Sequence, residues 1–227
     1  FDLMLKRLGE SLPKSEIFIP FDIENDYLNY VDGKSRLDGI RSFLESRLVA
    51  LPEGSPNDLS FDTINGLSSV KNEFYQNLLE LMDDIIYSDS IKLIDILYHN
   101  KIPICVASSS QNCQLILHKS GLYNKFDHVI GGKDLVLNLL QSKPSPDIYQ
   151  HVFDKLGIPP NDCIVIEDAV SGVIAAKKAN AGLVIGLERN SSRHLANFGA
   201  DFTVNSLDQL KLTFKENGQI TCSIKIN

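Results

Sequence analysis

The amino-acid sequence predicts an α/β protein in which a doubly wound parallel sheet follows a helical domain. From residue 88 onward, short apolar runs alternate with helical stretches, an order that is typical of a parallel sheet with right-handed crossovers. Before that point the apolar residues recur at helical spacing, and no apolar run of β type precedes residue 100. We therefore expect a helical domain at residues 1–87 and an α/β domain at residues 88–227.

Two long helices are predicted in the first domain. Leucine, isoleucine and phenylalanine recur at helical spacing over residues 37–48 and again over residues 64–85, so each stretch has one apolar face. The segment between them, Leu51–Asp58, contains two prolines and a glycine and is predicted to be a loop.

The second domain is predicted to contain four strands, a short fifth strand and the helices that connect them. The strands are expected at residues 102–107, 126–130, 163–167, 182–187 and 201–204. The helices are expected at residues 91–100, 111–120, 147–156 and 170–180. The tail from Gln219 to Asn227 alternates apolar and polar residues, which is typical of a half-buried strand at the edge of a sheet.

The composition indicates a soluble, cytoplasmic enzyme. Of the 227 residues 43% are hydrophobic, but no apolar run approaches the roughly 20 residues of a membrane span, and no signal-peptide pattern opens the chain. The net charge is −7 with no basic block, which argues against binding to nucleic acid. We therefore expect neither a membrane nor a nucleic acid as a partner, and we expect a monomer.

The cysteines and histidines indicate no zinc site. The four cysteines do not have the spacing of metal ligands, and the five histidines form no cluster. Cys105 and Cys163 lie inside apolar, strand-like runs. We interpret them as small core residues of a protein in a reducing compartment.

The first of three polar clusters follows the predicted strand at residues 102–107. Ser108, Ser109, Ser110 and Asn112 stand where a parallel strand ends and a helix begins. Hydroxyl groups and backbone N–H groups in that position can cradle a phosphate. The alternative is an ordinary serine cap of the helix, and this segment by itself does not separate the two.

The second polar cluster surrounds Lys143. Prolines at positions 144 and 146 stiffen the loop just before the predicted helix at residues 147–156. A lysine fixed in this way could offset the charge of a phosphate or of a developing anion. The alternative is a lysine that is simply solvated, as loop lysines usually are.

The third polar cluster is the acid pair Glu167 and Asp168, at the end of the apolar run at residues 163–167. Open α/β sheets bind ligands at the carboxyl ends of their strands, and the helix that follows places its positive N-terminus beside the two acids. Two adjacent carboxylates are suited to a hard cation such as Mg²⁺. The alternative is that Asp168 only caps the helix.

In this order and spacing, the three clusters resemble motifs of the haloacid dehalogenase superfamily of phosphotransferases, in its β-phosphoglucomutase-like branch. Ala-Ser-Ser-Ser, Ser-Lys-Pro-Ser-Pro-Asp-Ile-Tyr and Ile-Glu-Asp-Ala-Val-Ser-Gly look like the second, third and fourth motifs of that family. The resemblance covers essentially the whole chain. It implies a Rossmann-like core with a helical cap that closes over the active site.

The resemblance also implies roles for residues of the helical domain. The segment Tyr30–Gly39 looks like the substrate-facing part of the cap. There Arg36 would meet the distal phosphate of the substrate, and Lys71 with Asn72 would reach the substrate or the transferring phosphoryl group. Without the resemblance, Arg36 and Lys71 would be interpreted as parts of a solvated helix face.

One motif of the family is missing from the chain. The family's nucleophile lies in an Asp-x-Asp motif at the end of the first core strand, whereas Phe-Asp-Leu-Met at the start of this chain has no second aspartate. We interpret residues 1–9 as an early cap helix and expect the first strand to lie upstream in the native protein; a shortened, inactive relative is the alternative. Because that strand is central in the fold, the strands carrying Val106 and Ile166 should lie apart instead of pairing directly.

The implied reaction is attack by an upstream aspartate on a phosphate monoester, which gives an aspartyl-phosphate. Asp168, supported by Glu167, would hold Mg²⁺, while Ser108 and Lys143 would bind the phosphoryl oxygens. The expected substrate is a small phosphorylated metabolite, in particular a sugar phosphate. Transfer to water would make the protein a phosphatase, and transfer to a sugar phosphate that turns around under the cap would make it a mutase. A catalytically inactive binding domain of the same fold is the other class of function that stays open.

Overall fold

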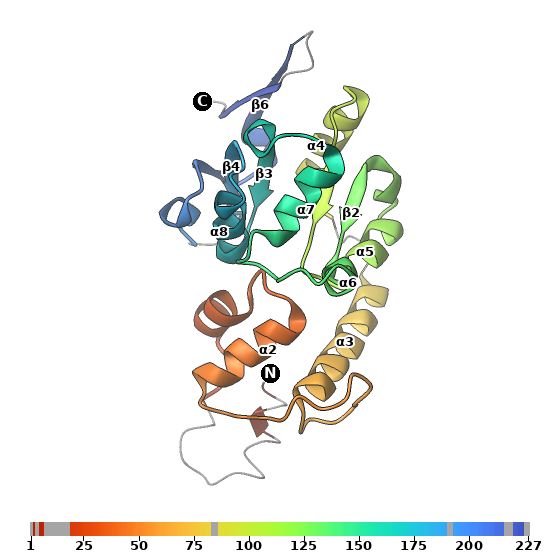
Figure 1. Cartoon of the computed structure of the whole chain (residues 1–227), viewed down its shortest axis with the longest axis vertical. Helices are drawn as coiled ribbons and strands as arrows, with labels where there is room; N and C mark the ends of the chain where they lie inside the picture. The colour runs from red at the N-terminus through yellow and green to blue at the C-terminus, as the bar shows by residue number, and fades with distance from the viewer. Residues whose placement is uncertain are drawn as a thin grey trace. The chain divides into compact units, whose positions relative to one another are not determined.

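The structure is a computed structural model. It describes residues 2, 5, 6, 19–82, 86–189, 193–215 and 220–224. The chain divides into two compact units, Phe1–Asp83 and Asp84–Asn227, and Figure 1 follows both along the chain. Apart from residues 2, 5 and 6, the predicted early helix lies outside the described residues.

Helices and loops make up residues 19–82 of the first unit, without a strand. The helices are η1 (Ile23–Val31), which is a π-helix, α2 (Arg36–Ser46) and α3 (Ile64–Leu81). Side-chain caps mark where two of them begin, because the Ser35 side chain accepts a hydrogen bond from the N–H of Asp38, and that of Thr63 accepts one from Gly66. The π-helix is an element that the sequence did not predict.

The core of the first unit consists of apolar residues that the helical spacing predicts. Ile40, Phe43 and Leu44 of α2 are fully buried. They belong to one cluster with Ile64 and Leu67 from the first turns of α3. The two helices are therefore packed through the faces that their sequences mark as apolar.

The second half of α3 departs from the predicted pattern. Phe74, Leu78 and Leu81 continue the apolar spacing, but all three are exposed. The exposed fraction is 60% for Phe74, 55% for Leu78 and 82% for Leu81. The spacing identifies an apolar helix face, but it does not tell what covers that face. The helix also ends at Leu81, before the predicted end at residue 85.

The parallel strands of the second unit form two sheets. In one sheet β1 (Cys105–Ala107) pairs with β2 (His128–Ile130); in the other β3 (Ile164–Glu167), β4 (Leu183–Leu187) and β5 (Phe202–Val204) pair in that order. Each lies within a strand that the sequence predicts. β1 begins later than predicted, after Pro103, which has no N–H to donate to a neighbouring strand.

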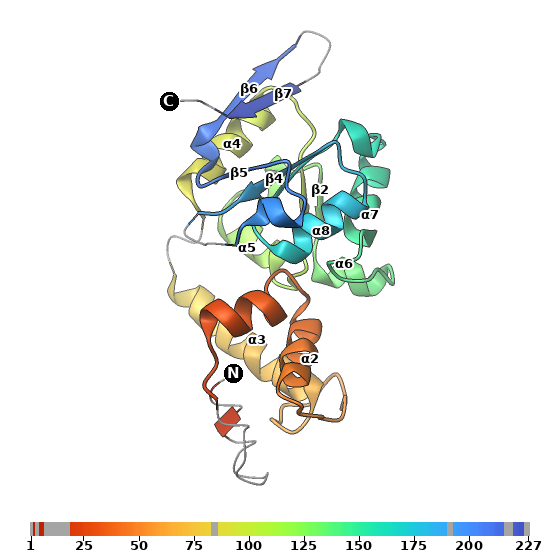
Figure 2. The same ribbon diagram turned by 90° about the vertical axis from the view of Figure 1, so that its left-hand side faces the viewer.

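Helices cover both faces of these strands. They are α4 (Ser88–His99), α5 (Cys113–Lys119), α6 (Gly132–Leu137), α7 (Asp147–Leu156) and α8 (Val170–Lys178). Figure 2 shows α7 and α8 on one side of the strands, with α4 and α5 on the other, so the unit is doubly wound as predicted. α6 was not predicted, because six residues are too few to give a periodic signal. None of the described helices is long and apolar enough to cross a membrane.

One apolar core serves both sheets. Ile148 of α7, Val173 of α8 and Val184 of β4 are fully buried. The same cluster contains Ile130 from β2 and Val165 from β3. The two sheets therefore share their packing although no pairing between described strands joins them.

A gap in strand pairing separates β1 from β3. Among the described strands, β1 pairs only with β2, and β3 pairs only with β4. Each of the two has one edge along which no described strand lies, and backbone N–H and C=O groups at such an edge need partners. The strands of Val106 and Ile166 thus do not pair directly, as the sequence predicts for a core that lacks its central strand.

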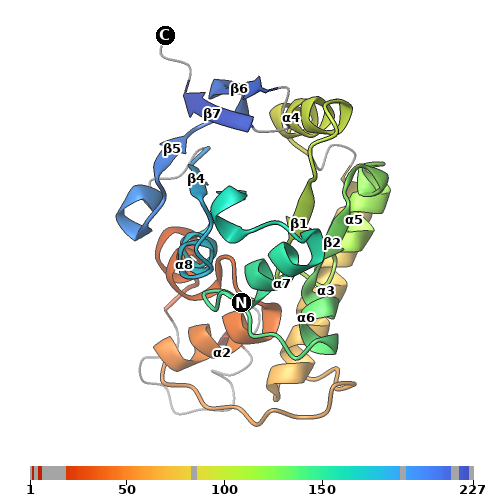
Figure 3. The same cartoon turned by 45° about the horizontal axis from the view of Figure 1, so that its top comes forward.

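The described part of the C-terminal tail forms a strand at the edge of a sheet, as predicted, and that sheet is a hairpin separate from the parallel strands. β7 (Ile220–Ile224) pairs antiparallel with β6 (Leu210–Phe214), an element that the sequence did not predict, in a separate two-stranded sheet. Figure 3 shows this hairpin beside α4 and β5. The physical reason is a matched apolar face, because Leu210 stands opposite Ile224 and Leu212 opposite Cys222.

Candidate active site at the carboxyl ends of the parallel strands

Ser108 stands directly after β1, where its N–H donates to the carbonyl of Ile130 at the end of β2 at 2.9 Å. Its hydroxyl accepts the N–H of Ser110 at 3.2 Å, and the hydroxyl of Ser110 accepts the N–H of Asn112 at 3.2 Å. These bonds turn the chain from β1 toward α5. Ser108 is therefore held at the carboxyl edge of the first sheet.

Two other members of this polar cluster are buried. Only 8% of Ser109 and 5% of Asn112 is exposed, which suits side chains that support the loop more than side chains that contact a ligand. The loop after β2 packs closely against them, because a β-carbon at Gly132 would lie 2.5 Å from the carbonyl oxygen of Ser109. Glycine at position 132 thus permits the close approach of the two loops.

Lys143 is a buried cation that bridges the ends of β1 and β3. Only 5% of the residue is exposed. Its ammonium group donates to the carbonyl oxygen of Ala107 at 3.0 Å and forms an ion pair with the Glu167 carboxylate. The ammonium also lies 5.1 Å from the centre of the Tyr149 ring, on α7. The lysine predicted from its proline-rich loop is therefore fixed by its neighbours and not solvated.

Glu167 is buried and its carboxylate is fully engaged. One oxygen accepts from Lys143 and from the hydroxyl of Tyr149, and the other accepts the N–H of Ala169 at 3.4 Å. Burial and the Glu167 charge raise the pKa of Tyr149 well above its ordinary value, so its hydroxyl keeps its proton and donates. These contacts favour Glu167 as the counter-ion of Lys143 over the role of a metal ligand.

Asp168, the next residue, is exposed and lies where the chain leaves β3 for α8. Partial removal of the carboxyl from water raises its pKa, and the charge of Glu167 raises it further. The positive charges of Arg193 and Lys143 act in the opposite direction. A carboxylate on an exposed residue at the edge of a sheet is suited to an oxygen-seeking cation.

Arg193 is a residue of this site that sequence reasoning missed. It follows β4, and its Nη1 donates to the carbonyl oxygen of Asp168 at 2.8 Å. The surrounding segment contains only polar residues and has no motif. Its position beyond the carboxyl end of a predicted strand is the signal that could have identified it.

The candidate residues of the helical unit form a second group. Nη2 of Arg36, in the first turn of α2, donates to the side-chain oxygen of Asn72 on α3 at 2.7 Å. Lys71 is next to Asn72, and burial together with the Arg36 charge lowers its pKa to about 8. Burial also lowers the pKa of Arg36. Two cations that are partly removed from water and repel each other would both be stabilised by a bound anion.

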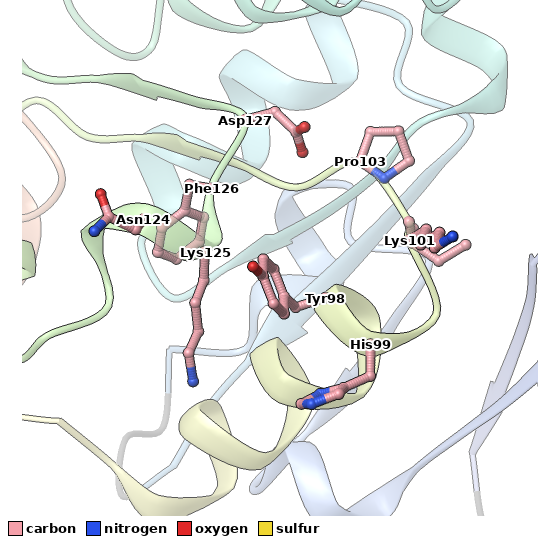
Figure 4. A pocket seen from close by; sticks show the side chains of 9 residues that line it. Tyr98, His99, Lys101, Pro103, Asn124, Lys125, Phe126 and Asp127 are labelled. Carbon is pink, nitrogen blue, oxygen red and sulfur yellow. The ribbon is translucent and has the colours of Figure 1, made fainter.

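A hollow of about 490 Å³ lies elsewhere in the second unit. Figure 4 shows its lining, which includes Tyr98 and His99 of α4 and Phe126 before β2. Pro103, also in the lining, precedes β1, whereas Ser108 follows it. The hollow is therefore at the opposite end of these strands and does not belong to the candidate site.

Comparison with known proteins identifies relatives that match between about half and most of the chain. The family model of haloacid dehalogenase-like hydrolases matches residues 8–180. A β-phosphoglucomutase from Mycobacterium tuberculosis is 34% identical over 215 residues, which cover 92% of this chain and 81% of that protein. A fructose-1-phosphate phosphatase from Escherichia coli is 27% identical over 124 residues, covering 53% of this chain and 61% of the relative. The crystal structure of a β-phosphoglucomutase from Clostridium difficile matches with a TM-score of 0.70 at 23% identity, over 92% of this chain and 83% of the other.

Proposed function

The chain belongs to the haloacid dehalogenase-like hydrolase family, and we propose on that basis that it transfers the phosphoryl group of a sugar phosphate with the help of Mg²⁺. The observation that carries this proposal is the ammonium group of Lys143, which is held between the ends of β1 and β3 by Ala107 and Glu167. The relatives named as β-phosphoglucomutase and fructose-1-phosphate phosphatase support a phosphorylated sugar as the substrate.

Ser108 and Lys143 would bind the oxygens of the transferring phosphoryl group. The Ser108 hydroxyl and the N–H groups of its loop are donors at the end of β1, and Lys143 adds a positive charge that Glu167 keeps in place. Because this charge is fixed before the substrate arrives, it need not reorganise when negative charge spreads over the phosphoryl oxygens in the transition state.

Asp168 is the residue that we propose as the Mg²⁺ ligand of this chain. Asp168 is an exposed residue, whereas Glu167 would have to release Lys143 and Tyr149 before it could coordinate directly. Among the described residues, no three His, Cys, Asp or Glu side chains gather into a metal site, so Asp168 would act with oxygen ligands from elsewhere. When bound, the cation would neutralise charge on the phosphoryl group.

The nucleophile would come from a strand that lies between β1 and β3. Both strands have an edge without a described neighbour, yet they share one core. An additional parallel strand would satisfy both edges and would end beside Lys143 and Asp168. An aspartate there would attack phosphorus, and the sugar oxygen would leave with a proton from a second aspartate. Water or a sugar hydroxyl would then attack the aspartyl-phosphate and restore the carboxylate.

Whether the protein is a phosphatase or a mutase depends on what accepts the phosphoryl group from the aspartyl-phosphate, water or a sugar hydroxyl. The relative from Mycobacterium tuberculosis, similar over 92% of this chain, is named as a β-phosphoglucomutase, and this likeness favours mutase activity as the second candidate. Arg36, Lys71 and Asn72 would suit it, because a sugar bisphosphate has a second phosphate for these residues to hold.

The proposal is tested by incubating the native-length protein with hexose phosphates and following the phosphorus-containing products by ³¹P NMR. Release of inorganic phosphate indicates a phosphatase, and conversion of β-glucose 1-phosphate into the 6-phosphate indicates a mutase. Lys143→Ala should abolish either reaction. If no phosphorylated sugar reacts with or without Mg²⁺, the protein is a binding domain of this fold and the proposal is wrong.

A further inference from the structure

The loop after β4 places a guanidinium group on the turn between β3 and α8. Nη1 of Arg193 donates to the carbonyl oxygen of Asp168 at 2.8 Å, across 25 positions of sequence. The Nε atom of the same side chain is buried, and the residue as a whole is half-buried. It therefore contacts the backbone of the residue that we propose as the cation ligand.

The carbonyl group that Arg193 holds lies outside the regular structure on either side. Glu167 is the last residue of β3 and stands opposite Gly186 in β4. Ala169 is the N-cap of α8, and its carbonyl accepts from Gly172 at 3.1 Å and from Val173 at 3.0 Å. Asp168 is thus the one residue between the strand and the helix cap, at the point where the chain changes direction.

We propose that Arg193 is a positioning residue, which fixes the peptide of Asp168 so that its carboxylate is presented to a divalent cation. The inference rests on the proposed function, since it assumes that Asp168 is a cation ligand. A ligand whose backbone is already held loses less freedom on binding, and residues that orient metal ligands contribute strongly to affinity.

Whether replacing Arg193 weakens or tightens cation binding distinguishes the positioning role from a simple effect of its charge. The positive charge of Arg193 repels a cation bound nearby. If charge alone mattered, replacing Arg193 with a neutral residue would tighten cation binding. If Arg193 positions Asp168, the same replacement weakens binding in spite of the removed repulsion.

The test compares Arg193→Gln, Arg193→Lys and Lys177→Gln in the native-length protein. Lys177 is the matched control, because it is a cation of α8 whose ion pair with Asp201 is partly exposed and does not involve the acid turn. Mg²⁺ binding is measured by titration calorimetry, and unfolding temperature is measured without metal. We expect Arg193→Gln to weaken Mg²⁺ binding about tenfold, Arg193→Lys to recover part of the loss through its own donor, and Lys177→Gln to bind normally.

Equal or tighter Mg²⁺ binding by a folded Arg193→Gln variant would overturn the inference. If that variant unfolds at a lower temperature, the comparison moves to Arg193→Lys, which keeps the charge and must still bind Mg²⁺ more weakly than the unmodified protein. An unmodified protein that binds no Mg²⁺ would contradict the proposed function itself, and the inference with it. Normal Mg²⁺ binding by the unmodified protein and by Arg193→Gln alike would contradict only the inference.

Discussion

At the scale of single residues, the central feature of the candidate site is the buried ion pair between Lys143 and Glu167. A buried ammonium group is tolerated only where it is paired and hydrogen-bonded. Here Ala107 accepts a hydrogen bond from it, and Glu167 neutralises it. Tyr149 completes the arrangement by donating to Glu167. The position of the Lys143 ammonium therefore depends on its contacts with Ala107 and Glu167, and Tyr149 supports the second of these.

Replacing Glu167 with glutamine should cost much stability. The change leaves the Lys143 ammonium buried without a counter-ion, and losing one partner of a buried ion pair costs roughly 3–5 kcal/mol in the free energy of unfolding. Tyr149→Phe, which removes one hydrogen bond to the same carboxylate, should cost less, about 1.5–3 kcal/mol. Urea denaturation of both variants checks the order, and an equal or smaller cost for Glu167→Gln would contradict it.

Replacing Asp168 with asparagine should affect activity but not stability. Burial and the charge of Glu167 disfavour the ionised form of the Asp168 carboxyl, so replacing it with a neutral amide of the same size should not lower the free energy of unfolding. The change removes the charge that would hold Mg²⁺, so Mg²⁺-dependent turnover should be abolished. Steady-state rates and an unfolding curve measure the two effects separately. Activity within a factor of two of the unmodified protein would mean that Asp168 does not hold the cation.

Lys71 should impose a pH limit on substrate binding. Its pKa is lowered to about 8 by burial and by the charge of Arg36, so in the free protein the ammonium is charged below pH 8 and loses its proton above it. The value of kcat/KM for a sugar phosphate should therefore decrease as the pH rises through about 8. In Lys71→Arg the guanidinium stays charged, and this decrease should disappear. A pH profile that is the same in both proteins would exclude Lys71 from substrate binding.

Among the elements, α8 must come unusually close to the end of β3. A β-carbon at Gly172 would lie 2.2 Å from the Glu167 carboxylate. That carboxylate cannot move aside easily, because Lys143 and Tyr149 hold it. The absence of a side chain at position 172 therefore allows the helix to begin directly over the acid pair.

Gly172→Ala should destabilise the protein although alanine favours helices. The gain in helix propensity is about 1 kcal/mol, but the new methyl group would displace the Glu167 carboxylate from Lys143. We expect a lower unfolding temperature and reduced turnover. The matched control is Gly39→Ala in α2, where the nearest atom to a β-carbon is Cγ1 of Val31 at 3.2 Å, a contact that a side chain can relieve. If both variants are equally stable, the close approach of α8 has no energetic role.

For the molecule as a whole, the most informative feature is one apolar cluster shared by two sheets whose described strands do not pair with each other. Ile130 and Val165 belong to one apolar cluster, although they come from different sheets. Buried backbone groups without hydrogen bonds cost roughly 1–3 kcal/mol each. A strand between β1 and β3 would remove that cost along both edges, and it would also carry the proposed nucleophile.

Hydrogen exchange can detect this strand. In a protein that contains the proposed strand, amides of β1 and β3 that face the gap should exchange more slowly than in the 227-residue chain, because they would be hydrogen-bonded. The amides that hydrogen-bond β4 to β5, which pair in the described structure, serve as the internal control, and their exchange rates should change little. Equal exchange at the edges of β1 and β3 in the two proteins would mean that the gap is not filled.

The sequence by itself determined the order of the five parallel strands and of the helices α4, α5, α7 and α8, together with the three polar clusters at the edge of the sheet. Strand and helix periodicity is local, so apolar runs such as residues 163–167 and the acids after them could be found without knowing the fold. Only the tertiary structure decided what these residues do to one another. Lys143 and Glu167 are 24 positions apart, and their contact depends on how the loop before α7 folds over the end of β3. Arg193 reaches Asp168 from a loop without any motif, because non-local contacts follow from packing, which short-range sequence patterns do not encode.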